Sequence, residues 1–524
     1  MSRLAKTIGL RTVPVADTRN HEGFPAYLPS SDHAVAELLF LGTVGNTYYA
    51  TGEEWGDLTI NVTLKKAQED PRFLAQAAVL ARWQGFVRSA PLMALMALLS
   101  EGPRAQALGS RIFERIVQTG DDLRNYVALA QSQRFRQGYG GITRRLAAAW
   151  LNQHLDEYQA IKYNGSGDRL SLRNILRMTH PRPTTLERDA VFQWVVRGTI
   201  AAEADLPMIR ALDGLSKGTI DPVAAIVQGH LPFEAVMPRI EQGNADVWRA
   251  LLDHAPYMFL LRSLNAFGQA GVWSDPNALE VAVRKLTDPA RVAKAMQFPF
   301  RYYQASEVLI QNQAPRRLVN AVYDALELSL GNMPDLGPIR LAVAPDVSGS
   351  MVQTRVAGNS SAAIIAGLFS AALWKRYPEA SMLPFGTQVV SVGHISPRDS
   401  IITIAHGLGT LNGGGTDLSA PIRTLLGREQ EVDLFVGLTD SEDWAASGGW
   451  NGQGFLAAWH TYRKQVASNA QAVLIQLAPS GTRVAPSEEL GVHYVYGWSD
   501  TVLQYLSYVI KGHSIIDHIR HTEI

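Results

Sequence analysis

The 524-residue sequence contains no cysteine. It therefore cannot form disulfides, zinc–thiolate sites or a cysteine nucleophile, and this absence is compatible with a reducing cytoplasm. The sequence also lacks long apolar runs. Residues 89–100 (SAPLMALMALLS) come closest, but they are too few to span a bilayer and are expected to form a buried helix. Because the first twenty residues lack the apolar core of a signal peptide, we expect a soluble, cytoplasmic protein.

A net charge is missing as well, since 48 Lys and Arg balance 48 Asp and Glu. The charges are unevenly spread along the chain. From residue 334 onward, 12 basic residues face 16 acidic ones, whereas residues 134–182 hold nine basic residues and three acidic ones. A polyanionic partner is therefore expected to bind the first part of the chain.

Several catalytic motifs are absent. The sequence has no G-x-x-x-x-G-K-[ST] phosphate loop, no H-E-x-x-H and no G-x-S-x-G. Residues 406–415 (HGLGTLNGGG) nearly form a dinucleotide fingerprint, but Asn412 occupies the position of the third glycine. Catalysis is not indicated, and we expect that the protein is not an enzyme.

The pattern of apolar residues divides the chain into two parts. From about Ser30 to Gly331, apolar residues recur at i, i+3 and i+4 in short segments separated by polar turns. This pattern predicts antiparallel helix pairs stacked into a curved solenoid. One exception is residues 38–52 (LLFLGTVGNTYYATG), which are expected to be a β-hairpin or an extended segment.

Residues 331–338 (GNMPDLGP) are expected to be a linker, and after it strands alternate with helices. The strand candidates are 339–346, 381–386 with 388–393, 432–440, 471–478 and 492–498. Continuous apolar strands with crossover helices predict a doubly wound, mostly parallel α/β domain. The predicted domains are thus residues 1–333, which are mainly α-helical, and residues 334–524, which are α/β.

Oxygen-bearing side chains directly follow two of the expected strands, and a third cluster lies in a glycine-rich loop. Ligands in such a fold bind at the carboxyl ends of strands. Carboxylates and hydroxyls suit Mg²⁺ or Mn²⁺ but not zinc. D-x-S-x-S alone is also ordinary turn and capping chemistry, but three clusters in this order favour a metal site. The candidate ligands are Asp346, Ser348, Ser350, Thr416 and Asp440.

The motifs DVSGSM (346–351), GGGTD (413–417) and LTD (438–440) resemble those of the von Willebrand factor A domain and its metal-ion-dependent adhesion site. The resemblance implies that the five candidate ligands coordinate the ion, some through water. Residues 18–49, 138–152, 161–183, 230–238 and 247–268 resemble segments of the TROVE module. The whole chain is similar to the TROVE/Ro 60 kDa family, and most like its bacterial orthologues. It departs from the family by a single glycine in NHEGFPAYL and by an apparent insertion between Lys162 and His180.

This resemblance implies a ring-like domain of HEAT-type helical repeats followed by a von Willebrand factor A domain. It further implies that Y-like small noncoding RNA binds to the outer surface of the ring. Single-stranded 3′ ends of misfolded or structured RNA would enter its central hole. The bound RNA would tether an exoribonuclease such as polynucleotide phosphorylase. We expect a monomer that acts in RNA quality control or decay and does not bind membranes.

The basic stretch between residues 134 and 182 fits this expectation independently. Cationic side chains neutralise phosphates, and aromatic rings such as those of Phe135, Tyr139, Tyr158 and Tyr163 can stack on unpaired bases. The candidate RNA-binding residues are Arg134, Arg136, Arg144, Arg145, Lys162, Arg169, Arg173, Arg177 and His180. The resemblance singles out Lys162 and His180 as the positions that match the family's RNA-contacting lysine and histidine.

Other interpretations remain open. The arginines could form an ordinary solvated helix face, and His180, which precedes Pro181, could cap a helix. The whole protein could instead be an adaptor that binds polypeptides through the solenoid and a carboxylate through the metal site. A metal-dependent hydrolase centred on Asp346 is a further alternative.

Overall fold

The computed structural model describes residues 16–20, 25–41, 51–132, 134–135, 140–164, 170–240, 244–297, 299–356, 360–393, 395–440, 454–478, 482–486, 491–497 and 500–524. By contacts the chain divides into two compact units. The α/β unit comprises residues 1–62, 83–87 and 332–522, and the helical unit comprises residues 63–82, 88–331 and 523–524. This division does not follow the predicted boundary between residues 333 and 334, which stays a prediction. The predicted closure of the helices into a ring also stays a prediction.

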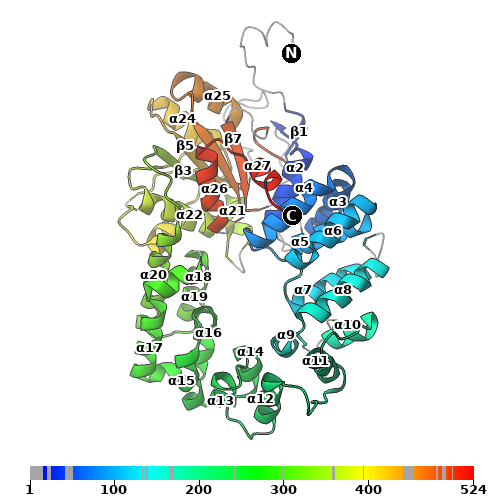
Figure 1. The fold of residues 1–524 in the computed structure, drawn as a ribbon. Coiled ribbons are helices and arrows are strands. Elements are labelled where there is room, and N and C mark those ends of the chain that lie inside the picture. The colour runs from blue at the N-terminus through cyan, green and yellow to red at the C-terminus, as the bar shows by residue number, and fades with distance from the viewer. Residues whose placement is uncertain are drawn as a thin grey trace. The chain divides into compact units, whose positions relative to one another are not determined.

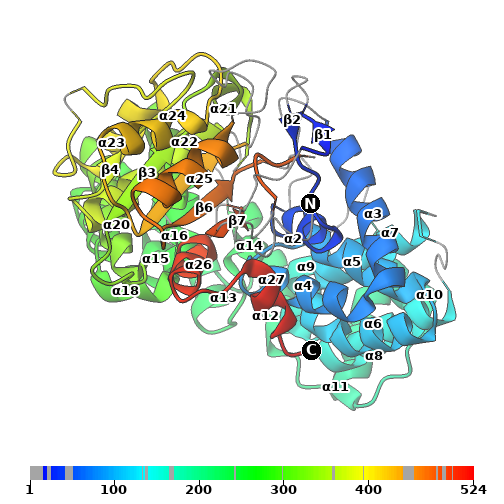
Figure 2. The ribbon, with the colours of Figure 1, turned by 90° about the horizontal axis from the view of Figure 1, so that it is seen from above.

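The α/β unit contains a five-stranded parallel sheet with the order β4-β3-β5-β6-β7 (Figures 1 and 2). Its strands are β3 (Leu341–Pro345), β4 (Ser381–Met382), β5 (Leu434–Thr439), β6 (Gln471–Gln476) and β7 (Val492–Tyr496). All residues of β3 and β5 are buried. Because successive side chains of a strand point to opposite faces, both faces of the sheet are covered. The predicted doubly wound α/β fold is confirmed.

The crossover helices follow the predicted alternation. They are α21 (Gly349–Gln353), α22 (Ala362–Arg376), α23 (Ile401–Gly409), α24 (Ser419–Gly427) and α25 (Phe455–Gln465). Two further helices, α26 (Asp500–Ile510) and α27 (Ile515–Arg520), follow the last strand. Phe435 of β5 packs on Phe455 and Trp459 of α25, with ring centroids 6.3 and 6.1 Å apart. The chain leaves β3 toward β4 on one side and returns to β5 on the other side. The carboxyl ends of β3 and β5 therefore flank the topological switch point of the sheet.

The amino-terminal segment belongs to the α/β unit. Strands β1 (Thr18–Arg19) and β2 (Pro25–Ala26) form a short antiparallel pair, and helix α2 (Ser31–Leu41) packs on β7 and α27. The prediction of extended structure is wrong for residues 38–41, because this apolar run continues α2 and is buried through residue 40. The Ser30 hydroxyl accepts a hydrogen bond from the His33 amide and so caps the helix. Residues 42–50 of the expected hairpin lie outside the described residues.

The helical unit confirms the prediction of successive short helices. Neighbours such as α5 and α6, or α19 and α20, pack as pairs that follow one another in a curved row (Figure 1). The helices in or partly in this unit are α3 (Gly52–Glu69), α4 (Pro71–Trp83), α5 (Ser89–Ser100), α6 (Pro103–Ile116), α7 (Gly120–Gln131), α8 (Gly141–His154), α9 (Glu157–Tyr163), α10 (Leu172–Thr179), α11 (Leu186–Arg197), α12 (Pro207–Ser216), α13 (Pro222–Val227), α14 (Phe233–Val236), α15 (Ala245–His254), α16 (Tyr257–Gln269), α17 (Pro276–Leu286), α18 (Pro289–Ala295), α19 (Pro299–Gln311) and α20 (Arg316–Leu328). Short 3-10 turns, η1 (Met237–Arg239), η2 (Val272–Ser274) and η3 (Ser329–Asn332), complete the list.

Polar residues set the helix boundaries in this unit. Thr119 and Asp122 form a reciprocal capping box at the start of α7, while Asp221, Asp275 and Asp288 cap helices that begin with proline. The segment 142–162, which has one continuous helical pattern, is divided at Asp156, which caps α9.

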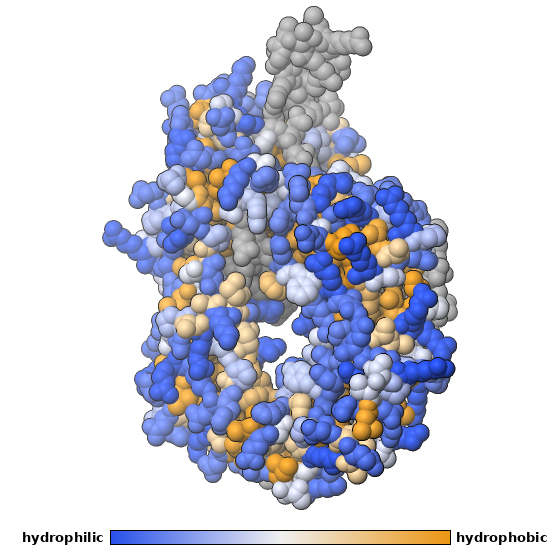
Figure 3. Space-filling model, viewed as in Figure 1, coloured by the Kyte–Doolittle hydropathy of each residue, from blue (hydrophilic) through white to orange (hydrophobic). Residues whose placement is uncertain are grey.

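In the view of Figure 3, most of the surface over the helical unit is hydrophilic, with scattered apolar residues. Among the described residues, no helix has the length and apolar character needed to cross a membrane.

Candidate functional site

The two predicted acidic ligands lie on neighbouring parallel strands. Asp346 directly follows β3, and Asp440 directly follows β5. Pro345 pairs with Leu438 in the sheet register, and the Asp346 amide donates a hydrogen bond to the Leu438 carbonyl over 2.9 Å. The strand ladder therefore fixes both carboxylates at the same edge of the sheet.

Backbone hydrogen bonds bring the glycine-rich loop to the same edge. The Gly413 amide donates to the Val347 carbonyl over 3.1 Å, and the Gly349 amide donates to the Gly414 carbonyl over 3.2 Å. Gly414 has a φ of +73°, a conformation that residues with a side chain rarely adopt. These contacts hold the loop that leads to Thr416 against the D-x-S-x-S turn.

The five candidate ligands are all buried, with exposed fractions between 0% and 8%. One carboxylate oxygen of Asp346 accepts a hydrogen bond from the Ser348 amide over 2.9 Å, and the other accepts from the Thr439 hydroxyl over 2.8 Å. The hydroxyls of Ser348 and Ser350 are 3.2 Å apart. Thr439 was not predicted as part of the site, although it is the threonine of the LTD motif. It orients the Asp346 carboxylate.

The electrostatics of this pocket suit a cation. Burial, followed by the nearby charge of Asp440, raises the pKa of Asp346 to about 7. The hydroxyl oxygen of Thr416 is buried and has no hydrogen-bond partner among the described residues. Two buried carboxylates and three hydroxyls are oxygen donors of the kind that Mg²⁺ or Mn²⁺ prefers. The residues present therefore fit the predicted ion.

The neighbouring Asp417 has a different role. Its carboxylate accepts hydrogen bonds from the Ser419 amide at the start of α24 and from the Arg423 guanidinium over 2.7 Å. Among the described residues, no group of three or more His, Cys, Asp or Glu could hold a metal. A cation at this edge of the sheet would thus depend on hydroxyls as well as carboxylates.

The structure brings together only some of the predicted RNA-binding residues. Arg144 and Arg145 are exposed on α8, and Arg173 and Arg177 are exposed on α10. These four are called the α8/α10 arginines below. The two helices pack against each other, and the Arg144 side chain donates a hydrogen bond to the Thr179 carbonyl at the end of α10 over 3.4 Å. Arg173 reaches in another direction and donates to the Val195 carbonyl of α11 over 3.0 Å.

His180 and Arg134 flank these helices. His180 is exposed and ends α10 in the left-handed region, with a φ of +46°. This is the capping position that its place before Pro181 suggested as an alternative to RNA contact. Arg134 is exposed in the segment that precedes α8. Arg136, Tyr139 and Arg169 lie outside the described residues.

Lys162 makes its polar contacts with side chains of α9 and α14. Its ammonium group lies 3.4 Å from the Glu234 carboxylate of α14 and 2.9 Å from the Tyr158 hydroxyl. Burial opposes its charge, but the Tyr158 hydrogen bond and the Glu234 carboxylate raise the pKa of Lys162 overall. The ammonium also lies over the Tyr158 ring, 5.2 Å from its centroid. Phe135 is 3% exposed, so the expectation that its ring is available for stacking is wrong.

Comparisons with known proteins agree with both halves of the chain. A model of the Ro60 vWA domain matches residues 340–509, and a model of the TROVE domain matches residues 236–348. The chain therefore resembles the TROVE/Ro 60 kDa family in both of these domains. It is 28% identical over 452 residues to the RNA-binding protein RO60 of Deinococcus radiodurans, which covers 82% of this chain and 83% of that protein. The crystal structure of the Deinococcus radiodurans RO (RSR) protein has the same fold. It matches with a TM-score of 0.69 and 24% identity, over 92% of this chain and all of that one.

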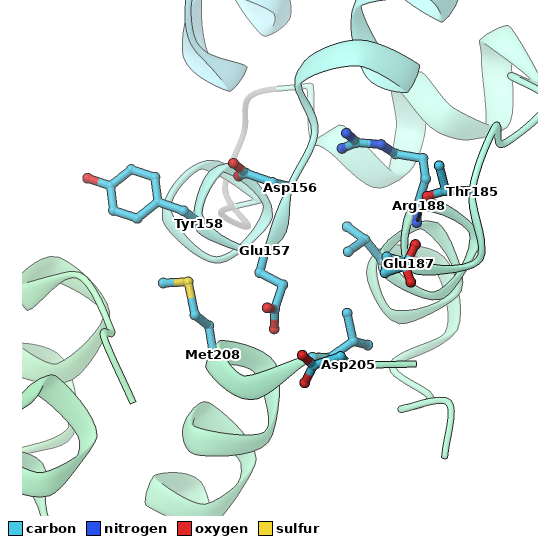
Figure 4. A pocket seen from close by; sticks show the side chains of 10 residues that line it. Asp156, Glu157, Tyr158, Thr185, Glu187, Arg188, Asp205 and Met208 are labelled. Carbon is cyan, nitrogen blue, oxygen red and sulfur yellow. Dashed lines mark hydrogen bonds between the residues drawn. The ribbon is translucent and has the colours of Figure 1, made fainter. Parts of the chain in front are cut away.

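An acidic pocket of about 300 Å³ lies beside Tyr158 in the helical unit (Figure 4). It is lined by the beginnings of α9 and α12 and by α11. Glu157 accepts a hydrogen bond from the Ile209 amide over 2.8 Å, and burial raises the pKa of Glu157. Its carboxylates would repel phosphates, so this pocket does not extend the basic surface. The acidic lining residues are Asp156, Glu157, Glu187 and Asp205.

Proposed function

We propose that this protein binds RNA and acts by binding, not by catalysis. Similarity to the TROVE/Ro 60 kDa family carries the proposal, because the relative from Deinococcus radiodurans is named an RNA-binding protein. The excess of basic residues in the first part of the chain supports it independently. The α8/α10 arginines also support it, because exposed guanidinium groups can neutralise phosphates.

In its finer form, the proposal is that a Y-like small noncoding RNA binds at the α8/α10 arginines. Single-stranded 3′ ends of misfolded or structured RNA would bind elsewhere on the helical unit. The bound RNA would then tether an exoribonuclease such as polynucleotide phosphorylase. The protein would thus act as a scaffold in RNA quality control.

A titration of a structured RNA hairpin, followed by fluorescence anisotropy at several salt concentrations, tests this proposal. The Arg145→Ala/Arg177→Ala variant should bind the hairpin more weakly than the wild type. The slope of log binding constant against log salt concentration should also become smaller in magnitude by about 2, because each lost phosphate contact removes roughly one unit. A matched control is Arg284→Ala/Arg316→Ala, which removes two exposed arginines from α17 and α20. Equal loss in both variants would show that only total charge matters, and no binding by the wild type would refute the proposal.

We also propose that Asp346, Ser348, Ser350, Thr416 and Asp440 hold a Mg²⁺ or Mn²⁺ ion. When bound, the ion would offer a site for one oxygen of a partner, such as a carboxylate. The buried Thr416 hydroxyl supports this proposal, because a cation would satisfy an oxygen that otherwise lacks a hydrogen bond among the described residues.

A Mn²⁺ titration followed by electron paramagnetic resonance tests the site. Thr416→Val keeps the size of the side chain but removes the oxygen, so we expect at least about tenfold weaker binding. Thr424→Val is the matched control, because its hydroxyl donates only to the Ala420 carbonyl within α24. Unchanged Mn²⁺ affinity in the Thr416 variant would refute the assignment.

A further inference from the structure

Asn412 is followed directly by Gly413 in the glycine-rich loop that leads to Thr416. Its side chain is exposed and is not among the proposed ligands of the cation. An asparagine that precedes a glycine is open to attack by the next backbone nitrogen, because glycine has no Cβ that would hinder the approach. The loop therefore contains a candidate site of spontaneous deamidation.

The reaction needs only water and the residues of the loop. The Gly413 amide nitrogen gives up its proton and attacks Cγ of the Asn412 side chain. A bond forms between these two atoms, the bond from Cγ to Nδ2 breaks, and Nδ2 takes up a proton and leaves as ammonia. Water then opens the resulting succinimide ring at one of its carbonyl groups. The product is either aspartate or isoaspartate, in which the main chain runs through the side-chain methylene group.

In the folded loop, hydrogen bonds hold the atoms of this reaction away from attack. The Gly413 amide donates a hydrogen bond to the Val347 carbonyl over 3.1 Å, and the Gly413 carbonyl accepts one from the Thr387 amide over 3.0 Å. The Asn412 Oδ1 atom accepts a hydrogen bond from the Gly414 amide over 3.2 Å. Attack on Asn412 would break the bond to Val347 and turn the peptide group that precedes Gly413.

Close packing fixes the same peptide group. A Cβ atom added to Gly386 would lie 2.0 Å from the Gly413 carbonyl oxygen, and one added to Gly413 would lie 2.7 Å from the Gly386 Cα atom. The two glycine backbones thus touch and leave no space for a rotation of the chain at Gly413. Deamidation therefore requires a local opening in which the loop leaves Val347 and Gly386.

The same contacts connect this opening to the cation site. Val347 lies between Asp346 and Ser348, and the Gly349 amide donates a hydrogen bond to the Gly414 carbonyl over 3.2 Å. An ion held by Thr416 on the loop and by Asp346 at the strand end would bind only the closed loop and so stabilise it. Opening, and with it deamidation, should be more frequent in chains without the ion.

We propose that Asn412 is a deamidation site controlled by the closure of its loop on Val347, and that isoaspartate formation permanently removes the cation site. Isoaspartate adds one methylene group to the main chain before Gly413, and the contact with Gly386 leaves no space for it. Aspartate keeps both the main chain and the oxygen that accepts from the Gly414 amide, so that product can close. The part of this inference that concerns the ion rests on the proposed cation site.

The test incubates the full chain in mildly alkaline buffer and follows the tryptic peptide 399–423 by liquid chromatography and mass spectrometry. In the native chain, Asn412 should deamidate at least about tenfold more slowly than in the chain unfolded by urea. The Asn-Gly pairs at 164–165 and 451–452 are references in the same samples, because all three asparagines should react at similar rates in urea. Equal rates at Asn412 in the native and the unfolded chain would overturn the proposal.

Added Mg²⁺ tests the connection to the ion. At about ten times its dissociation constant, Mg²⁺ should slow deamidation of the native wild type about tenfold, and that of Thr416→Val at most about twofold. After long incubation without the ion, the wild type should lose Mn²⁺ binding, measured by electron paramagnetic resonance, in proportion to its isoaspartate content. Asn412→Gln cannot form a five-membered ring, so it is the matched control and should keep its Mn²⁺ binding.

Two further outcomes separate this inference from the proposed cation site. Full Mn²⁺ binding by a sample rich in isoaspartate would overturn the loss of the site on modification. If the fresh wild type binds no Mn²⁺, the proposed cation site fails. The comparison of native and unfolded chain then still decides whether the loop controls Asn412.

Discussion

A buried ion pair between Arg483 and Glu37 should be the strongest single link between the amino-terminal segment and the rest of the α/β unit. The guanidinium lies 2.5 Å from the Glu37 carboxylate, and the two side chains are 0% and 4% exposed. The same guanidinium stacks over Tyr494 and Tyr496, with distances of 5.1 and 5.6 Å to the ring centroids. Two backbone hydrogen bonds join Arg483 to Tyr27.

The cost of breaking this pair depends on which partner is left behind. Glu37→Leu removes the carboxylate and leaves a guanidinium that is buried and permanently charged, which should destabilise the α/β unit by about 3–5 kcal/mol. The double variant Glu37→Leu/Arg483→Met removes both charges and keeps apolar volume. It should recover most of this loss, since apolar replacements of buried ion pairs are often neutral or stabilising.

Urea unfolding of the wild type, both single variants and the double variant measures the coupling energy of the cycle. Tryptophan fluorescence and circular dichroism should be recorded together, because the two units of the chain need not unfold in one step. We expect the double variant to be more stable than Glu37→Leu by at least about 2 kcal/mol. A Glu37→Leu loss below about 1 kcal/mol, which is typical of exposed pairs, would refute this reasoning.

Three further predictions concern stability. Burial, and then the charge of Arg483, lower the pKa of His33 to about 4 in the folded chain. Below about pH 6.5, His33 therefore binds a proton in the unfolded chain but stays neutral in the folded chain until the pH approaches 4. Stability should therefore fall by about 2 kcal/mol between pH 7.5 and pH 5 on this account, and His33→Gln should remove that share of the pH dependence in urea unfolding. Gly386→Ala should cost about 1–3 kcal/mol of stability by thermal unfolding, because the new methyl group would lie 2.0 Å from the Gly413 carbonyl oxygen. Asp122→Ala should cost about 3–5 kcal/mol by urea unfolding, because it removes a helix cap and leaves the buried Arg82 without its carboxylate at 2.6 Å.

Each of these variants has a contradicting outcome. Equal pH dependence of the wild type and His33→Gln would show that His33 titrates normally in the folded chain. Gly427→Ala is the control for Gly386→Ala, because an added methyl group there meets nothing within 4 Å. Equal melting temperatures of these two variants would contradict the close approach of the loops. A loss of less than about 1 kcal/mol for Asp122→Ala would mean that the pair with Arg82 contributes only as a surface pair does.

The sequence predicts the α/β unit well because its strands and their ends carry local signals. Buried strands appear as continuous apolar runs, and Asp346 and Asp440 follow two of them directly, so their proximity could be predicted. The role of Thr439 could not, because its hydrogen bond to Asp346 joins residues 93 positions apart and depends on the strand register. The apolar run at residues 38–41 forms the end of a helix, although the sequence predicts an extended segment there, because a short apolar run has no period that separates a strand from a buried helix.

The basic residues show the limit of reading charge along the chain. Lys162 stands among arginines in the sequence, but the fold places it against Glu234, which lies 72 positions away. Arg483 likewise has no local sign of its pairing with Glu37, because 446 residues separate them. Charge density in the sequence therefore marks the helical unit but not the residues that share a surface.

Photo-crosslinking of bound RNA to the full chain, followed by mass spectrometry of the crosslinked peptides, tests the central proposal most directly. A structured RNA with a hairpin should crosslink to peptides from α8 and α10. Crosslinks confined to peptides after residue 334 would contradict the assignment of RNA binding to the helical unit.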